Sequence, residues 1–134
     1  MLAADAARVT KARLADLTHA GRPLRLHAYP EVYGVLSTPS VQDLTVNAPQ
    51  GWVMVLKPRA VGMGHVDGRW TVTVQVAVPR GVDPLPLAQL ITRRLHHSPR
   101  HPTGFTFMGD EDAGITGPVR ALNLSFLANI RHQE

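Results

Sequence analysis

Three consecutive acids stand at Asp110, Glu111 and Asp112, within the stretch GDEDAGITGPVR. Carboxylate oxygens are the ligands that divalent cations prefer, but the stretch lacks the D-x-[DN]-x-[DN]-G pattern of a calcium loop. A nuclease-like cluster would need further acids from other strands, and nothing in the spacing of Asp43 and Asp67 requires them to join. We therefore expect a solvated or interfacial loop here, with a cation between subunits as the less favoured form.

A second concentration of chemistry-bearing side chains is the basic stretch RRLHHSPRH, which contains His96, His97 and His101. Zinc ligands on a helix are typically four residues apart, whereas adjacent helical residues point about 100° apart. His97 and His101 have the right separation, but Pro99 breaks the helix between them. No Ser/His/Asp or Cys/His set has a recognisable motif either. The sequence therefore predicts no metal site, no catalytic residue and no cofactor.

The composition limits the class of protein. The chain has 134 residues, of which 44% are hydrophobic and 18% charged, so we expect one globular domain over residues 1–134. It has no cysteine, which excludes a disulfide framework. Charged residues interrupt the apolar start, and no apolar run approaches the length of about 18 residues that spans a bilayer. We expect no membrane association and a protein made and assembled in the cytoplasm.

The charge balance is basic, with a formal net charge of +4 and a sequence pI near 10.3. A basic balance can indicate nucleic-acid binding. The basic residues are spread along the chain, however, and only RRLHHSPRH is dense. Aromatic residues, which stack on single-stranded bases, make up only 5%. A small basic nucleic-acid-binding module remains an alternative.

Two segments have the apolar spacing of a helix. Residues 3–20 carry one stripe, with Gly21 as the expected C-terminal cap: Ala3, Ala7, Thr10, Leu14 and Leu17. Residues 84–97 carry another, begun by Asp83 as cap and Pro84 at the first helical position: Leu87, Leu90, Ile91 and Leu95.

The clearest strands are residues 69–78 and 119–130, where apolar and polar residues alternate. Shorter strands are expected at 24–28, 41–46, 52–57 and 104–108. The glycine-rich stretch 58–68 has the wrong spacing for a phosphate-binding loop and is expected to be a long, flexible connection. The order of elements predicts an α+β fold, a mostly antiparallel sheet flanked by two helices.

The order of these elements also resembles a known family. GRWTVTVQVAVP, a helix, and then DEDAGITGPVRALNLSFLANI are similar to the C-terminal half of the tail terminator proteins of long-tailed, lambda-like bacteriophages. RLHAYP followed by STPSV resembles the Tyr-Pro and later Pro-Val elements of actinobacteriophage members. The resemblance covers nearly the whole chain in order, and the sequence departs from it in RRLHHSPRH and in the proline-rich helix start.

The resemblance implies a structural virion protein. Family members form a hexameric ring that caps the completed tail tube, stops its polymerisation and joins the head or neck. The implied partners are further copies of the chain, the major tail tube protein and a head-completion or neck connector protein. Genomic DNA would only pass through the lumen, and the location would be the head–tail junction of the virion. The residues we expect at a subunit or partner interface are Arg59, His65, Arg69, Asp110, Glu111 and Asp112.

Other readings stay open beside this one. Another head–tail connector or tail-tube ring protein would also be a small α+β subunit. The nucleic-acid-binding module is an alternative of a different class, and a metal-dependent hydrolase built on the acidic trio is the least favoured.

Overall fold

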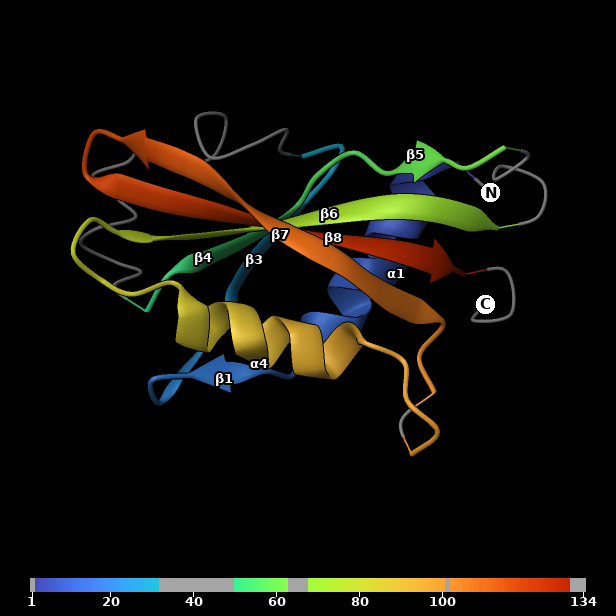
Figure 1. Cartoon of the computed structure of the whole chain (residues 1–134), viewed down its shortest axis with the longest axis horizontal. Coiled ribbons are helices and arrows are strands. Elements are labelled where there is room, and N and C mark those ends of the chain that lie inside the picture. The colour runs from blue at the N-terminus through green and yellow to red at the C-terminus, as the bar shows by residue number, and fades with distance from the viewer. Residues whose placement is uncertain (1, 32–49, 63–67, 101, 131–134) are drawn as a thin grey trace.

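The computed structural model describes residues 2–31, 50–62, 68–100 and 102–130 (Figure 1). Its elements follow in the order α1 (Ala3–Leu14), β1 (Thr18–His19), β2 (Arg22–Pro23), β3 (Arg25–Ala28), β4 (Trp52–Val55), β5 (Arg59–Ala60), β6 (Arg69–Pro79), α4 (Leu85–Leu95), β7 (Phe105–Thr116) and β8 (Val119–Asn129). The expected α+β class is confirmed.

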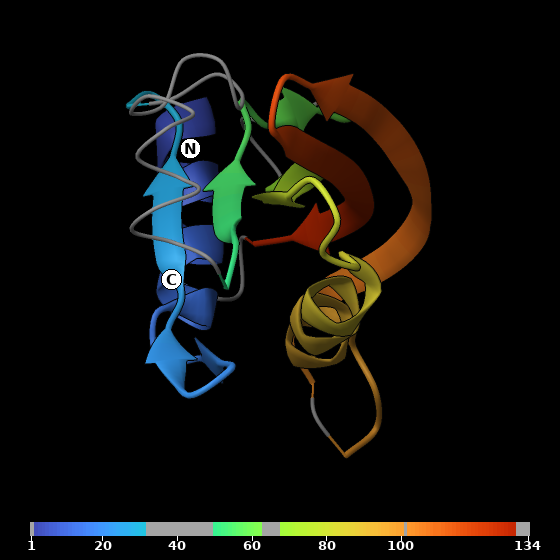
Figure 2. The ribbon, with the colours of Figure 1, turned by 90° about the vertical axis from the view of Figure 1, so that its left-hand side faces the viewer.

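Within the described residues, the main sheet has the strand order β3-β4-β6-β8-β7, and β5 pairs with the first part of β6. The pairs are antiparallel except for β3 with β4, which run parallel. Figure 2 shows β7 arching around one side of the sheet, with α1 on the opposite side beside β3 and α4 beneath the arch. The sheet is therefore mostly antiparallel, as expected.

One face of the sheet packs against α1 and α4 and forms the main core. The alternation in β6 and β8 places alternate residues of each strand on this face, including Val74, Leu124 and the fully buried Phe126. The predicted helical stripes pack against them through Leu14, Leu87 and similar residues. The change of apolar period along the chain therefore located this core correctly.

The other face carries a second, smaller apolar cluster of Trp52, Met54, Ala77, Val119 and Ala121. Beside it, the Gln75 Nε2 group donates a hydrogen bond of 3.0 Å to Asn123 Oδ1 across β6 and β8. The sheet is thus buried on both faces over part of its length.

Both helices are shorter than the sequence predicts. The helix expected over 3–20 ends at Leu14, and Gly21 lies in the β1–β2 hairpin. Leu17 is nevertheless buried, because the chain turns directly after the helix, where Leu17 N donates to Leu14 O. Leu17 therefore belongs to the apolar stripe although it is not helical. The helix expected over 84–97 spans Leu85–Leu95 and has Pro84, not Asp83, at its N-cap position. Asp83 lies one residue earlier, where its Oδ1 accepts a hydrogen bond of 3.0 Å from Leu85 N.

Two expected segments, 58–68 and 41–46, differ from the structure or lie outside its described residues. The segment expected as a long connection over 58–68 contains the short strand β5, while residues 63–67 lie outside the described part of the chain. The strand expected at 41–46 also lies outside it. Among the described residues, none of the helices has the length and apolar character to cross a membrane.

Candidate functional site

The acidic trio lies in a strand, which corrects the expectation of a loop. Asp110, Glu111 and Asp112 occupy the middle of β7, paired with Leu124, Asn123 and Leu122 of β8. The loop prediction failed because turn-forming glycines flank the trio. In the structure Gly109 and Gly114 adopt positive φ where the register shifts, so they form irregularities within a strand and do not end it. Asp112 Oδ1 accepts a 2.8 Å hydrogen bond from Gly114 N.

The strand divides the trio between two faces of the sheet. Residues directly opposite each other on paired strands share a face. Asp110 and Asp112 are opposite Leu124 and Leu122, which face the helices, whereas Glu111 is opposite Asn123 on the other face. Three carboxylates divided in this way do not converge on one cation. Among the described residues, no group of three or more His, Asp or Glu side chains is placed to hold a metal ion.

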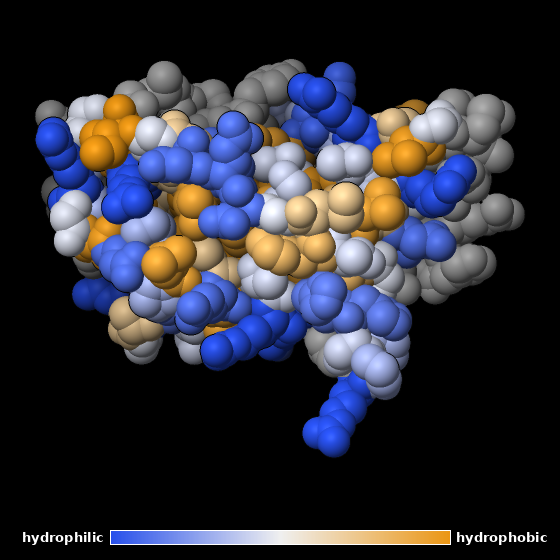
Figure 3. Space-filling model, viewed as in Figure 1, coloured by the Kyte–Doolittle hydropathy of each residue, from blue (hydrophilic) through white to orange (hydrophobic). Residues whose placement is uncertain are grey.

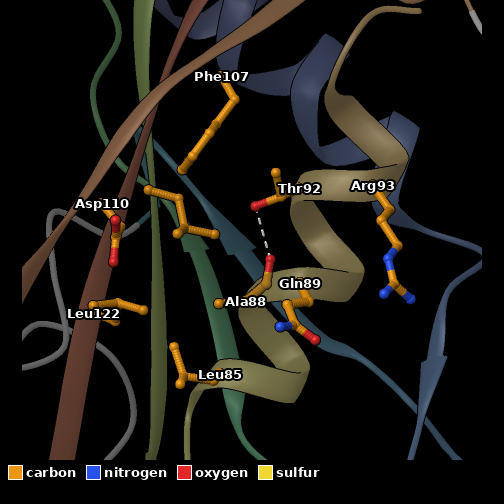
Figure 4. Close-up of a pocket in the computed structure, with 9 residues that line it drawn as sticks. Leu85, Ala88, Gln89, Thr92, Arg93, Phe107, Asp110 and Leu122 are labelled. Atoms are coloured by element: carbon orange, nitrogen blue, oxygen red, sulfur yellow. Dashed lines mark hydrogen bonds between the residues drawn. The ribbon is translucent and has the colours of Figure 1, made fainter.

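Asp110 lies at the edge of a groove between α4 and the β7–β8 pair (Figure 4). The floor of the groove is apolar and includes Leu122 and Leu124. Its volume is about 330 Å³. Phe107 lines the strand side, and the helix side is formed by Leu85, Ala88, Gln89, Thr92 and Arg93. The groove thus combines an apolar floor with one acid and one arginine at its walls.

The exposed apolar side chains nearest in the fold extend this surface. Leu85 is 51% exposed at the groove, and Val82 and Ile115 are also exposed near the same end of the sheet. On the face drawn in Figure 3, apolar residues occur as separate patches among hydrophilic ones. Sequence reasoning missed the groove, because Leu122 and Leu85 come together only through the packing of α4 on β8.

The predicted basic partners of the trio lie elsewhere in the sheet. Arg59 is on β5 and exposed, and Arg69 begins β6, opposite Asn129. β5 and β7 are separated by β6 and β8, which amounts to about 14 Å across the sheet at ordinary strand spacing. Arg69 lies opposite Asn129, whereas the acids pair with residues 122–124 of β8, so it is distant from them along the strands. Neither arginine therefore meets the acids within one copy, and the described residues contain no ion pair of the trio. His65 lies outside the described residues.

Arg59 borders a shallow hollow on the sheet surface that faces away from the helices. Leu56, Lys57, Thr71 and Thr73 complete its lining, and its volume is about 430 Å³. Two cations and two hydroxyls at one hollow suit an acidic group from another molecule. Sequence reasoning missed this hollow, because Lys57 and Thr71 are distant along the chain and only strand pairing brings them together.

The basic stretch RRLHHSPRH runs from the end of α4 into the connection to β7, and its His101 lies outside the described residues. His96 Nδ1 accepts a hydrogen bond of 3.0 Å from Phe107 N, and His97 Nδ1 accepts one of 3.1 Å from Thr103 N. The buried Thr103 hydroxyl donates to Leu95 O. These two histidines therefore shape the backbone.

One ion pair ties the two helices. Arg94 donates from Nη1 to Asp16 Oδ1 and, at 3.1 Å, to Arg13 O. The hydrogen bond from Arg94 holds the pKa of the Asp16 carboxyl below its ordinary value. This pair fixes the turn after α1 on the end of α4, and it has no role in the groove.

The fold and these surfaces define a small α+β protein. Its described features are an apolar groove beside α4, an acidic segment in β7 and a basic hollow beside Arg59 and Lys57. No protein-family model matches the chain, and no curated protein matches it at a significant level.

Proposed function

We propose that this protein is a structural virion protein that caps the end of a phage tail tube as a hexameric ring and forms the joint to the head or neck. The resemblance in the order of its segments suggests this role. The observation that carries the proposal is the placement of two complementary charged surfaces at separate positions on one sheet, with β6 and β8 between them.

A closed ring is built from head-to-tail contacts, in which two different surfaces of each subunit meet. The acidic strand β7 supplies one surface, and Arg59, Arg69 and the hollow beside Lys57 supply the other. Because the acidic strand and the hollow beside Arg59 and Lys57 do not meet within one copy, they can meet between neighbouring copies. Glu111, on the same face of the sheet as the hollow, is the acid best placed to enter it.

The ring would add the tube protein at one opening and a head-completion or neck connector protein at the other. Genomic DNA would pass through the lumen, and no catalytic residue, metal or cofactor is required. Another head–tail connector or tail-tube ring protein would use the same kind of contact. Tube proteins differ in forming long polymers instead of a single closed ring.

The alternative of a nucleic-acid-binding module gains no support from the described aromatic residues. Trp52, Trp70, Phe105 and Phe126 are buried in the core clusters, and Tyr29 and Phe107 are half-buried against the main cluster, so no described aromatic ring is fully exposed for stacking on single-stranded bases. The large exposed apolar side chains in the described part of the chain are aliphatic or methionine.

The test is a charge exchange between the two surfaces. Glu111→Lys and Arg59→Glu should each reduce assembly into rings, measured by light scattering and negative-stain imaging with purified tube protein present. The double variant should recover it, because the pair is restored with its sign exchanged. Particles in which the chain is located away from the head–tail junction would overturn the proposal.

A further inference from the structure

We propose that the outer edge of β7, the edge that faces away from β8, binds an extended basic segment of another protein as an added antiparallel strand. The contact centres on Asp110 and Asp112. It goes beyond the proposed ring and does not rest on it, because the ring contact uses Glu111, whose side chain lies on the other face of the sheet.

β7 ends the sheet on one side, and no other described strand pairs with its outer edge (Figure 2). An edge strand presents backbone N–H and C=O groups that can pair with a strand of another chain. Within the described chain, the first part of this edge is already used. Phe105 O accepts a hydrogen bond of 2.6 Å from His97 N, and Phe107 N donates one of 3.0 Å to His96 Nδ1. The outer edge is therefore open to hydrogen bonding, and its acidic part lies beyond these contacts.

The ladder between β7 and β8 identifies the backbone groups that reach the outer edge. Successive residues of a strand direct their N–H and C=O groups to opposite edges. Because Phe105 and Phe107 use the outer edge, Thr106 between them is directed toward Leu127 of β8. From Leu127, every second residue of β8 is directed toward β7, and Asn123 is one of them.

The acidic part of β7 follows the same alternation. Glu111 is opposite Asn123, so its backbone groups are directed toward β8. Its neighbours Asp110 and Asp112 therefore direct their N–H and C=O groups outward. Both side chains are exposed, and neither forms an ion pair with the described residues. Unpaired backbone groups and unpaired carboxylates thus occur at the same two residues.

The occupant that suits this edge is an extended segment with a basic residue at every second position. Residues directly opposite each other on antiparallel strands share a face of the sheet, with Cβ atoms about 4.5–5.5 Å apart. A lysine or arginine opposite Asp110, and another opposite Asp112, would each bring a cation to a carboxylate. The same two residues of the segment would exchange backbone hydrogen bonds with β7.

The groove beside Asp110 suits one of these basic side chains. It lies on the face to which Asp110 projects, and its floor of Leu122 and Leu124 is apolar. The methylene stem of a lysine or arginine packs on apolar surface while its charged end stays near a carboxylate. The groove volume of about 330 Å³ is near the lower limit of about 300 Å³ for small-molecule sites, so it suits a single side chain.

A second copy of the same edge is disfavoured as the occupant. Two β7 edges paired with each other would place acids opposite acids, and like charges directly opposite destabilise a strand pair. The register shifts at Phe107/Gly109 and Asp112/Gly114 also leave a short regular stretch for an added strand. We therefore expect a short contact that depends on the charge of the partner.

The first test uses a short synthetic peptide in which lysine and valine alternate, with both termini blocked. It should bind the full chain at low salt, and amide hydrogen exchange followed by NMR should slow at Asp110 N and Asp112 N. Exchange at Glu111 N, which is directed toward β8, should change little. A peptide that does not bind, or that binds without slowing exchange at these two amides, would overturn the proposal. Slow exchange there before peptide is added, together with dimer formation, would assign the edge to a second copy and overturn it as well.

The second test separates strand addition from attraction by charge alone. N-methylation of the lysines in the peptide removes the N–H groups that face β7 and should weaken binding at least about tenfold. N-methylation of the valines, whose N–H groups face away, should leave most of the binding. Equal affinities of the two methylated peptides would contradict strand addition.

Matched variants locate the contact. Asp110→Asn combined with Asp112→Asn should weaken peptide binding at least about tenfold. Asp5→Asn combined with Glu31→Gln removes the same charge from exposed side chains away from β7 and should have little effect. Equal effects of the two double variants would show that the peptide responds only to net charge and would overturn the proposal.

The outcomes separate this inference from the proposed function, because Glu111 and the hollow beside Arg59 are unchanged in these variants. Ring formation without peptide binding would reject the added strand and keep the ring. Peptide binding with the expected protection, by a chain that never forms rings, would support the added strand and reject the ring.

Discussion

His96 and His97 each accept a backbone N–H through Nδ1, which requires an unprotonated nitrogen at that position. The stretch that is densest in basic residues therefore contains imidazoles engaged in holding a turn. The acidic trio shows the reverse case, since its side chains project from both faces of β7 and make no ion pair with the described residues. At the scale of single residues, the hydrogen bonds therefore give His96 and His97 a structural role. The exposed carboxylates of the trio can instead interact with another molecule.

Replacing His97 tests the hydrogen bond that holds the connection between α4 and β7. His97→Phe leaves Thr103 N without an acceptor and should lower the free energy of unfolding by about 1–3 kcal/mol. His97→Asn keeps an acceptor near the position of Nδ1 and should lose less. Urea denaturation of both variants measures this, and equal losses would mean that the hydrogen bond contributes nothing.

The Asp16–Arg94 pair predicts a pH dependence of stability. Because Arg94 lowers the pKa of Asp16 in the folded protein, its contribution is complete above the unfolded value of about 3.9 and is lost as pH falls through the lower folded pKa. Asp16→Asn should therefore destabilise the protein at neutral pH and flatten its acid denaturation curve below about pH 4. Urea midpoints measured from pH 2 to 7 check this, and parallel curves for the two proteins would contradict it.

At the scale of elements, irregular backbone decides where strands and helices meet. Gly109 and Gly114 let β7 continue through two register shifts, so the strand keeps its pairing with β8 along its whole length. Gly51 precedes β4 with a φ of +109°, and its Cα lies against α4 and β6. Gly51 therefore allows the close approach of β4, β6 and α4, whereas Gly109 and Gly114 supply backbone conformations with positive φ.

Gly51→Ala tests that close approach. An added Cβ would lie 2.8 Å from Leu87 Cδ2 and 2.9 Å from Ala77 O, in a backbone conformation that alanine resists. We expect a loss of about 2–4 kcal/mol in the free energy of unfolding. Gly21→Ala is the control, because φ is +77° there but an added Cβ meets no atom within 4 Å, and it should cost about 1 kcal/mol. Equal losses in thermal or urea unfolding would show that packing at Gly51 is not tight.

At the scale of the whole molecule, acidic and basic residues occupy different parts of the sheet. The acidic residues lie on the edge strand β7, whereas Arg59 lies on β5 and Arg69 begins β6, both on the other side of β8. Arg80 and Arg120 lie near the β7–β8 turn, so the acidic character is confined to the middle of β7. In the proposed ring, this distribution would let the acidic surface of one copy meet the basic surface of the next.

Neutralising the whole trio tests the contribution of its charge to assembly. Asp110→Asn, Glu111→Gln and Asp112→Asn together should weaken ring formation while leaving the circular dichroism spectrum unchanged, since the three side chains are exposed. The loss should diminish as salt rises, because charges more than about 8 Å apart are screened at physiological ionic strength. A cation between subunits predicts instead that chelator mimics the substitution. Assembly that responds to neither salt, chelator nor substitution would leave the trio as solvated surface.

The sequence by itself determined the class of fold, the two longest alternating strands and the buried stripes of both helices. These follow from local periodicity, since a residue's position in a helix or strand fixes which face it occupies. The length of β7, the division of the acidic trio and the end of α1 at Leu14 were decided by tertiary structure. Gly109 and Gly114 have the local chemistry of a turn, and only pairing with β8 keeps them in a strand. The groove could not be predicted from the sequence either. It exists only where α4 packs beside Leu122 and Leu124, residues that lie far from the helix in sequence.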